Sequence, residues 1–417
     1  MREMKDSGAK WIGKIPSAWQ SDKLKYHLRR KEPKNPGDMT VLSLYRELGI
    51  IPKDSRDDNH NQTSEDTSKY KYVKPGNFVV NKMKAWQGSV AVSDYEGIVS
   101  PAYYVYEFTD KSFDKRYFHH LLRGCYKDEF MRLSGGMRVG QWDLSSEDLD
   151  NTLVVIPPID EQIKIAEFLD AKCSEIDALV ADIQAQIETL EQYKRSTIAE
   201  AVTKGINSNA SMKDSGAGWL GEIPSHWKTD KFKYRLSRSE PRNPGNMIVL
   251  SLYRELGIIP KDSRDDNHNQ TSEDISKYKH VKPGNFVVNK MKAWQGSVAV
   301  SDYEGIISPA YYVYKFTDDS FDKKYFHYLL RGCYKDEFMR LSGGMRVGQW
   351  DLSAEDLENT TIIIPPSEEQ TAISMYLDKK CSDIDTCVEA KKEQITTLEA
   401  YKKSIIFDYV TGKKEVV

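Results

Sequence analysis

The sequence predicts an α+β protein made of two similar halves, each a mixed α/β domain followed by one long helix. Three observations predict this fold. One sequence unit occurs twice with an offset of 208 residues, so that residues 41–66 recur unchanged as 249–274. Within each unit, strand-like runs stop at a Pro-Pro pair. Beyond each Pro-Pro pair, apolar residues follow the spacing of a coiled-coil seam.

The repeat divides the chain into domains. Two further stretches, 73–98 and 121–145, recur unchanged as 281–306 and 329–353. Solenoid repeats are far shorter than this unit, so a duplicated domain pair is indicated. The duplication either has no mechanical meaning or creates a pseudo-two-fold symmetry suited to a palindromic partner such as duplex DNA.

The composition changes within each unit, and this change sets the expected boundaries. Mixed α/β domains are expected at 1–158 and 206–366, and helices at 159–205 and 367–417. Strand-like runs occur at 77–80, 103–108 and 152–156. One amphipathic helix is predicted from Lys115 to Leu133, with Phe118, Leu121, Leu122, Cys125 and Phe130 on its apolar face.

The two long helices are the expected partners of each other in an antiparallel coiled coil, because neither could stay folded alone on so narrow an apolar stripe. In the alternative interpretation, each helix packs on its own domain. Lys391 interrupts the second stripe. The predicted seam consists of Ile176, Val180, Ile183, Ile187 and Leu190 in the first helix, and of Ile384, Val388, Ile395 and Leu398 in the second.

Composition limits the class of protein. The chain is 39% apolar and 29% charged, which is typical of a soluble globular protein. It has no run of about 18 uncharged apolar residues for a membrane span, and its first residues lack the apolar segment of a signal peptide. The five cysteines form neither a CxxC pair nor a disulfide framework, so a reducing, cytoplasmic location is expected.

The net charge of −3 hides an alternation along the chain. Residues 1–158 and 206–366 carry +3 and +1, whereas residues 159–205 and 367–417 carry −5 and −2. The mixed domains are therefore slightly basic and the helices acidic. Phosphate affinity needs a local basic face and not a basic chain, so this distribution permits DNA binding by the mixed domains.

No motif in the sequence fits the pattern required for catalysis or metal binding. The run from Gly8 to Ile15 resembles a P-loop, but Ile15 replaces the Mg²⁺-binding Ser/Thr. The repeated run Arg56–Asn61 and Arg264–Asn269 lacks the spacing of a metal site, so a solvated loop is favoured. A methyltransferase would need a polar residue before its Pro-Pro pair, and here isoleucine precedes both pairs.

What remains resembles a surface for reading DNA. The 82–87 loop and the glycine-rich 134–142 loop combine cations, amides and tryptophans. Arg and Gln suit base edges and Lys suits phosphates; the alternative is that the tryptophans are core residues and the charges are solvated. The candidate DNA contacts are Arg46, Lys82, Lys84, Trp86, Gln87, Arg138 and Gln141, with their copies Arg254, Lys290, Lys292, Trp294, Gln295, Arg346 and Gln349.

Two motifs resemble a known family. Trp11–Trp19 and its copy Trp219–Trp227 are similar to the opening of target-recognition domains in specificity subunits of type I restriction-modification systems. Ile156–Asp170 resembles the segment that enters their central helix, and Ile364–Gln370 is its second copy. The order of recognition domain, helix, recognition domain and helix covers nearly the whole chain. One departure is that family members usually carry two dissimilar recognition domains.

The resemblance implies a non-catalytic subunit that reads double-stranded DNA. Its partners would be two modification (methyltransferase) subunits, which methylate adenine, and two restriction (motor-nuclease) subunits. S-adenosylmethionine, ATP and Mg would belong to those partners, with no cofactor and no metal in this chain. Two rival hypotheses are a self-contained DNA-modifying or DNA-cleaving enzyme with an unrecognised site, and a coiled-coil scaffold without DNA contact.

The charge distribution makes a prediction about salt. With so slight a basic excess per domain, the isolated chain should bind DNA weakly, and its affinity should fall steeply between about 50 and 200 mM salt. Affinity should rise markedly once modification subunits enclose the duplex. Fluorescence anisotropy across a salt series measures both effects; tight, salt-insensitive binding by the chain alone would contradict the prediction.

Overall fold

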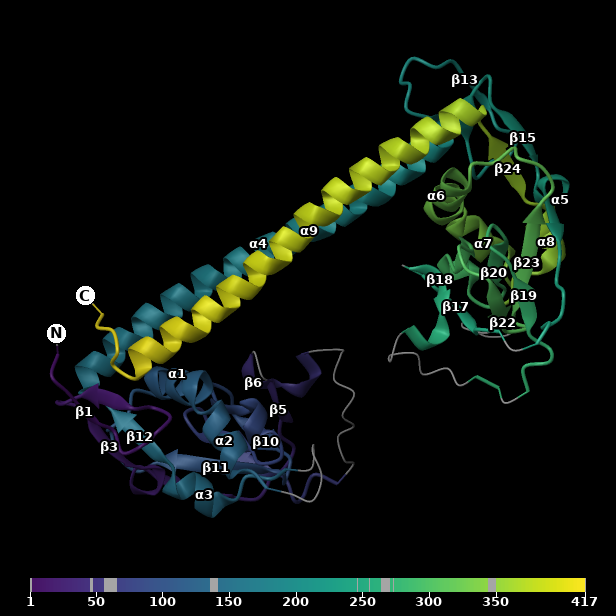
Figure 1. The fold of residues 1–417 in the computed structure, drawn as a ribbon. Coiled ribbons are helices and arrows are strands. Elements are labelled where there is room, and N and C mark those ends of the chain that lie inside the picture. Colours follow the sequence, from purple (N-terminus) through teal and green to yellow (C-terminus); the bar gives the residue numbers. More distant parts are fainter. Residues whose placement is uncertain are drawn as a thin grey trace. The chain divides into compact units, whose positions relative to one another are not determined.

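The computed structural model describes residues 2–45, 48–55, 66–135, 142–245, 247–254, 256–263, 271–272, 274–343 and 350–416. The chain forms two compact units, one of residues 1–183 with 392–417 and the other of residues 184–391. Each unit contains one mixed α/β domain and one part of each long helix (Figure 1). Both mixed domains have almost the same order of elements.

The first domain is built from short strands and helices. Its strands are β1 (Met4–Asp6), β2 (Lys14–Pro16), β3 (Gln20–Lys23), β4 (Leu28–Arg30), β5 (Leu42–Tyr45), β6 (Gly49–Pro52), β7 (Lys71–Val73), β8 (Phe78–Asn81), β9 (Val90–Val92), β10 (Gly97–Val99), β11 (Tyr103–Phe108) and β12 (Leu153–Ile156). Its helices are η1 (Leu24–Tyr26), η2 (Lys53–Ser55), η3 (Ala85–Gln87), α1 (Lys115–Cys125), α2 (Lys127–Leu133) and α3 (Ser146–Asn151), and the long helix α4 (Ile159–Lys204) follows.

The second domain repeats this order. Its strands are β13 (Met212–Asp214), β14 (Glu222–Pro224), β15 (Lys228–Lys231), β16 (Leu236–Arg238), β17 (Leu250–Tyr253), β18 (Gly257–Pro260), β19 (Lys279–Val281), β20 (Phe286–Asn289), β21 (Val298–Val300), β22 (Gly305–Ile307), β23 (Tyr311–Phe316) and β24 (Thr361–Ile364). Its helices are α5 (Phe232–Arg235), η4 (Lys261–Ser263), η5 (Ala293–Gln295), α6 (Lys323–Cys333), α7 (Lys335–Leu341) and α8 (Ala354–Asn359), and the long helix α9 (Ser367–Val410) follows.

An antiparallel four-stranded sheet in the order β4-β11-β8-β9 organises the first domain, and β16-β23-β20-β21 is its copy. In β11, Tyr103 pairs with Asn81 and Tyr106 with Phe78. Strand β8 is buried throughout, so the strand-like run at 77–80 forms the centre of the domain. Strand β12 pairs with β3 and thereby ties the segment that enters α4 to the N-terminal part of the chain.

Each domain has two apolar cores. The larger core of the first domain includes Trp19, Phe118 and Leu121, and it extends onto both long helices through Ile176 and Ile405. The smaller core lies between the four-stranded sheet and the β5–β6 hairpin and contains Leu42, Ile50, Val73, Val79, Ala91, Val99 and Val105. The part of the domain around the β5–β6 hairpin therefore has a core of its own, separate from the core that holds the long helices.

The prediction of one helix from Lys115 to Leu133 is wrong, because the segment forms two helices that meet at Tyr126. The Tyr126 side chain is fully buried, and its hydroxyl donates to the Leu153 carbonyl at 2.8 Å. Its ring also packs edge-on against Trp11 at 4.2 Å. The five-residue step from Cys125 to Phe130 does not keep both on one helical face, and the break restores the contact of both with the core.

The long helices pack antiparallel on each other in both units. In the first unit, the Phe168 and Tyr409 rings lie 4.4 Å apart and Lys402 pairs with Asp177 at 2.6 Å. In the second, Lys194 pairs with Asp385 at 2.7 Å. Each ion pair is the copy of the other at the 208-residue offset.

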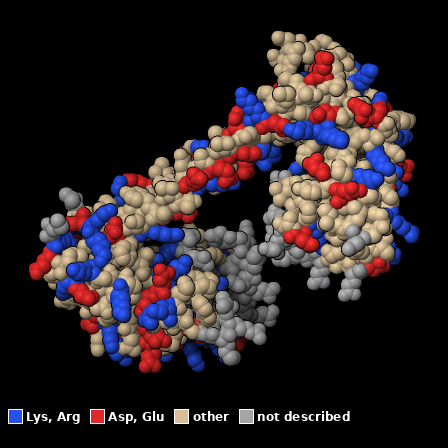
Figure 2. Space-filling view, viewed as in Figure 1, with Lys and Arg blue, Asp and Glu red and all other residues tan. Residues whose placement is uncertain are grey.

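The predicted seam residues lie on the inner faces of the helices. Ile176, Ile187, Ile384 and Val388 are buried, and Val180, Ile183, Leu190, Ile395 and Leu398 are half-buried. Lys391 is also half-buried, and its ammonium donates to the Gln186 amide oxygen. A polar pair thus replaces the apolar contact where the stripe is interrupted. Asp and Glu side chains gather along the outer surface of α4 and α9 (Figure 2).

A buried glutamine joins each mixed domain to the start of its long helix. Gln162 is 0% exposed, and its side-chain oxygen accepts from the Asp114 backbone N–H at 2.9 Å. Its amide nitrogen donates to the carbonyls of Ser112 and Pro157 at 2.7 and 2.8 Å. Gln370 makes the same three bonds in the second unit. This arrangement explains why a glutamine stands four residues after each Pro-Pro pair.

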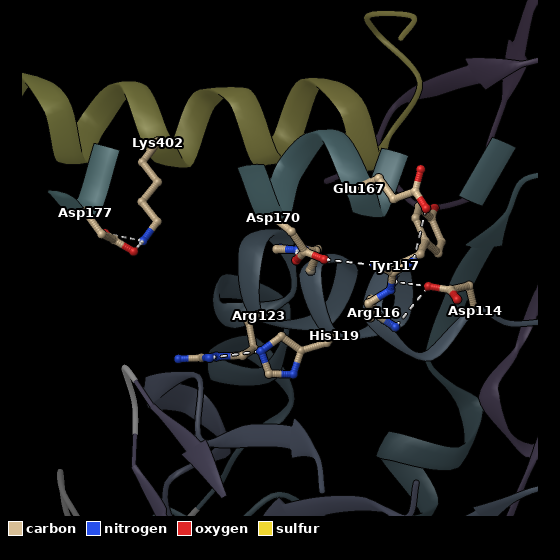
Figure 3. Close-up of polar contacts among 10 residues, drawn as sticks. Asp114, Arg116, Tyr117, His119, Arg123, Glu167, Asp170, Asp177 and Lys402 are labelled. Atoms are coloured by element: carbon tan, nitrogen blue, oxygen red, sulfur yellow. Dashed lines mark hydrogen bonds and ion pairs between the residues drawn. The ribbon is translucent and has the colours of Figure 1, made fainter. Parts of the chain in front are cut away.

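Polar contacts of α1 strengthen this junction (Figure 3). Asp114 caps α1 by accepting from the backbone N–H groups of Arg116 and Tyr117. Asp170 of α4 accepts from the His120 ring at 2.7 Å, and this bond holds the pKa of the Asp170 carboxyl below its usual value. The adjacent residue of α1 is His119, and burial lowers its pKa to about 3.

The end of the opposite helix contacts the same domain. The Tyr117 hydroxyl donates to the Val410 carbonyl of α9 at 2.9 Å, and the Tyr325 hydroxyl donates to the Val202 carbonyl of α4 at 3.0 Å. Beyond α9, Lys413 donates to the Ile12 carbonyl, and Arg2 pairs with Glu415 at 2.9 Å. Each mixed domain is therefore fixed to the start of one helix and the end of the other.

Gly124 makes this docking testable. A methyl group added at Gly124 would lie 2.2 Å from Cγ2 of Ile406 in α9, so Gly124→Ala should force α1 and α9 apart. We expect the free energy of unfolding to fall by about 1–3 kcal/mol, as for overpacked cores. Denaturant unfolding of the full chain measures the change, and Ile406→Ala in the same chain should recover part of it.

Gly218→Ala is the matched control. Gly218 is exposed, nothing lies within 4 Å of the added methyl group, and the first repeat has Lys10 at this position. We expect no loss of stability for this variant. Equal effects of Gly124→Ala and Gly218→Ala would refute the close approach of α1 and α9.

Candidate nucleic-acid interface

The 82–87 loop leaves strand β8 and ends in the short helix η3. Ala85 is fully buried and anchors η3, whereas Lys84 is exposed and Lys82, Trp86 and Gln87 are half-buried. The Trp86 indole N–H donates to the Met83 carbonyl at 3.0 Å, which closes the loop on itself. Gly88 then ends η3 at a φ of 86°, a conformation that favours glycine. The loop therefore presents its charged and amide groups from a fixed turn.

The ends of the second loop are described and lie beside the first. Gly135 and Asp143 exchange two backbone hydrogen bonds at 3.2 and 2.9 Å. The Trp142 ring packs edge-on against Trp86, with centroids 5.4 Å apart. The backbone N–H of Leu144 donates to the Lys82 carbonyl at 3.0 Å. Two loops about 50 residues apart in sequence thus meet at one place, as the reading-surface hypothesis requires.

Several predicted contacts lie outside the described residues. They are Arg46, Arg138 and Gln141 in the first repeat and Arg346 and Gln349 in the second. The runs Arg56–Asn61 and Arg264–Asn269 also lie outside the described residues. Where the structure describes His, Cys, Asp and Glu side chains, no three of them form a group that could hold a metal ion.

Lys82 has an acidic neighbour that the sequence did not reveal. Its ammonium lies 3.0 Å from the Asp143 carboxylate, and this hydrogen bond raises the pKa of Lys82. The second repeat has the same pair, Lys290 and Asp351, at 3.3 Å. The two residues are about 60 positions apart, so only the pairing of the two loops brings them together.

The second repeat has the same arrangement, with one more contact described. The Trp294 indole N–H donates to the Met291 carbonyl at 3.1 Å, and Trp294 packs on Trp350 at 5.3 Å. Lys292 is exposed. Arg254, at the end of strand β17, donates to the Gln295 side-chain oxygen at 2.8 Å. The β17–β18 hairpin therefore contributes to the same surface as the 290–295 loop.

Sequence reasoning missed a cation–aromatic cluster beside the first loop. The Arg30 guanidinium and the Lys71 ammonium lie 5.6 and 5.7 Å from the centre of the Tyr104 ring. Arg238, Lys279 and Tyr312 form the copy, at 6.0 and 5.7 Å. Comparison of the two repeats could have revealed this cluster, because both repeats keep these cations. Their neighbours Arg29 and Lys31, in contrast, become Ser237 and Ser239.

Other surfaces of the described chain give no competing site. The described cysteines are all unpaired with one another. None of the described helices is both long and apolar enough to cross a membrane. An open cavity of about 390 Å³ in the second unit is lined by residues of mixed character, among them Leu256, Lys323 and Asp378. The two loop surfaces therefore remain the candidate interface.

Proteins of similar sequence match this chain over most or all of its length. A putative type I restriction enzyme specificity subunit, MjaX, from Methanocaldococcus jannaschii is 24% identical over 436 residues, covering 100% of this chain and 93% of the relative. The MjaVIII specificity subunit from the same organism is 27% identical over 374 residues, covering 83% of each chain.

Solved structures share the fold at low identity. A chain from a study of complex assembly and conformational transition of the type I R-M system superposes with a TM-score of 0.70 at 16% identity, covering 96% of this chain and 99% of that one. The HsdS subunit from Thermoanaerobacter tengcongensis gives 0.53 at 17% identity, covering 96% and 98%.

The family model agrees with both comparisons. The model of the type I restriction modification DNA specificity domain matches residues 27–189 and 232–400, one copy in each half of the chain. Each match contains one complete pair of candidate loops and most of one long helix. The chain belongs to the specificity subunits of type I restriction-modification systems.

Proposed function

We propose that this chain reads a bipartite, palindromic DNA site and directs adenine methylation or cleavage by its partner subunits. One observation carries the proposal: the segments that are identical in the two repeats contain the loop surface of each domain. They include the β5–β6 hairpin, the 82–87 loop and the two ends of the 134–142 loop. Identical reading surfaces prefer the same bases.

The identical segments also supply most of the small core beneath that surface. Leu42, Ile50, Val73, Val79 and Ala91 all belong to them. Differences occur where the domain meets the helices, as with His120 and Tyr328, on the outer edge of β4, and at single positions outside the loops, such as Val99, which is Ile307 in the second repeat. This distribution is expected if both reading surfaces serve one base string while each junction adapts to its own helix.

The palindrome follows from the antiparallel helices. Equivalent contacts hold each domain on the helix pair, since Tyr117 bonds the end of α9 as Tyr325 bonds the end of α4. From these equivalent contacts we infer that the two domains approach the duplex in opposite senses, so that equal loops read opposite DNA strands. The shared string then appears as an inverted repeat separated by bases that are not read.

The residues have distinct proposed roles. We assign base contacts to Arg46, Gln87, Arg138 and Gln141 and to their copies Arg254, Gln295, Arg346 and Gln349, because Arg and Gln make bidentate contacts to guanine and adenine. Lys84 and Lys292 suit phosphates, and Trp86 and Trp294 support the loops. The chain itself is non-catalytic. Two modification subunits and two restriction subunits carry out the reactions, with S-adenosylmethionine, ATP and Mg on those partners.

Selection from a mixed-sequence duplex library tests this function against its rivals. The full chain is incubated with the library, with and without the modification subunit, and retained and processed DNA are sequenced. Enrichment of one motif without chemical change by the chain alone supports the proposal. Cleavage or methylation by the chain alone would identify an enzyme, and no enrichment even with the modification subunit would identify a scaffold.

Substitutions in the loops give a sharper prediction. Arg138→Ala with Arg346→Ala, or Gln141→Ala with Gln349→Ala, should reduce discrimination between the selected site and variants with one base changed. Each lost bidentate contact costs about 1–3 kcal/mol. Competition binding of the full chain with its modification subunit measures the ratio. Unchanged discrimination in both double variants would exclude these residues from base reading.

A further inference from the structure

The Lys82–Asp143 pair links the two candidate loops at their bases. Lys82 directly follows strand β8, and Asp143 closes the second loop through its backbone bonds with Gly135. Their side chains meet at 3.0 Å, and the Leu144 N–H reaches the Lys82 carbonyl. One ion pair and one backbone bond therefore connect the same two segments.

The second repeat has the same connection. Lys290 lies 3.3 Å from Asp351, and the Leu352 N–H donates to the Lys290 carbonyl at 2.9 Å. The tryptophan contact also recurs, with Trp86 on Trp142 and Trp294 on Trp350. All these residues belong to segments that are identical in the two repeats. The link is thus part of the shared reading surface.

The position of Asp143 argues against a phosphate contact for Lys82. A carboxylate 3.0 Å from the ammonium offsets its charge and would repel an approaching phosphate. Lys84, two residues further on, is exposed and forms no ion pair with any other residue that the structure describes. Lys84 is therefore the better phosphate ligand. Lys82 is instead available to connect the two loops through Asp143.

We propose that Lys82–Asp143 and Lys290–Asp351 are positioning pairs that set the two reading loops of each domain relative to each other. They act on discrimination between base sequences and not on affinity for the DNA backbone. This inference rests on the proposed function, because it assigns a role within the same surface.

The test uses the full chain with its modification subunit and the motif selected from the duplex library. One variant carries Asp143→Asn with Asp351→Asn, and a second carries Lys82→Met with Lys290→Met. A third exchanges the charges, with Lys82→Glu, Asp143→Lys, Lys290→Glu and Asp351→Lys. For each, binding is measured to the selected site and to a site with one base changed, across a salt series.

If the pairs position the loops, both neutral variants should lose about tenfold in discrimination between the two sites. This loss lies in the lower part of the range expected for one bidentate base contact. The salt dependence should stay the same, and the charge exchange should restore part of the discrimination. A phosphate contact predicts otherwise: removing the two lysines would lower the salt slope by about 1.8, and removing the two aspartates would leave discrimination unchanged. Either of these results would overturn the inference.

Lys31→Ser with Glu107→Lys is the matched control. It removes an ion pair of 2.5 Å on strands β4 and β11, and it installs the residues that the second repeat has at these positions. Discrimination should not change. If the wild-type chain selects no motif, the proposed function fails. If it selects one and all variants discriminate equally, only the positioning role fails.

Discussion

The buried side chain of Gln162, repeated as Gln370, is the constraint on which the rest of the structure depends. A fully buried amide costs several kcal/mol unless its hydrogen bonds are met, and here three bonds join the domain, the Pro-Pro turn and the helix. The direction in which each long helix leaves its domain is thereby fixed. Tyr117 and Tyr325 add a bond to the end of the opposite helix, so each domain holds both members of the antiparallel pair.

Two sides of each domain therefore serve different purposes. The side that holds the helices varies between the repeats, as where His120 and Tyr328 both bond an aspartate of the adjacent helix. On the loop side, the β5–β6 hairpin, the 82–87 loop and the 134–142 loop are identical in sequence. On the β4–β11 edge, Arg29, Lys31 and Glu107 become Ser237, Ser239 and Lys315, so the cations move but one excess positive charge is kept. The substitution from Glu107 to Lys315 is thus balanced by its neighbours.

Much of the fold could be predicted because its signals are local or repeated. The run at 103–108 forms β11, the coiled-coil spacing lies in α4 and α9, and the duplication corresponds to two domains with almost the same order of elements. The only local signal for the break at Tyr126 was the five-residue step from Cys125 to Phe130, and the bond of the Tyr126 hydroxyl to the Leu153 carbonyl joins residues that the sequence alone does not bring together. For the candidate site, composition predicted the two loops, and the structure shows only that their described parts lie side by side. The partners Asp143 for Lys82 and Tyr104 for Arg30 depend on strand register, which one sequence does not reveal.

Methylation mapping tests the central claim most directly. The gene and its modification partner are introduced into a strain without other adenine methylation, and modified bases are located by single-molecule sequencing. The account predicts one bipartite motif whose two halves are the same base string in inverted orientation, with an unread spacer and methylation of an equivalent adenine on each strand. Two unrelated half-sites in the mapped motif would contradict the account, because identical reading surfaces cannot prefer different bases.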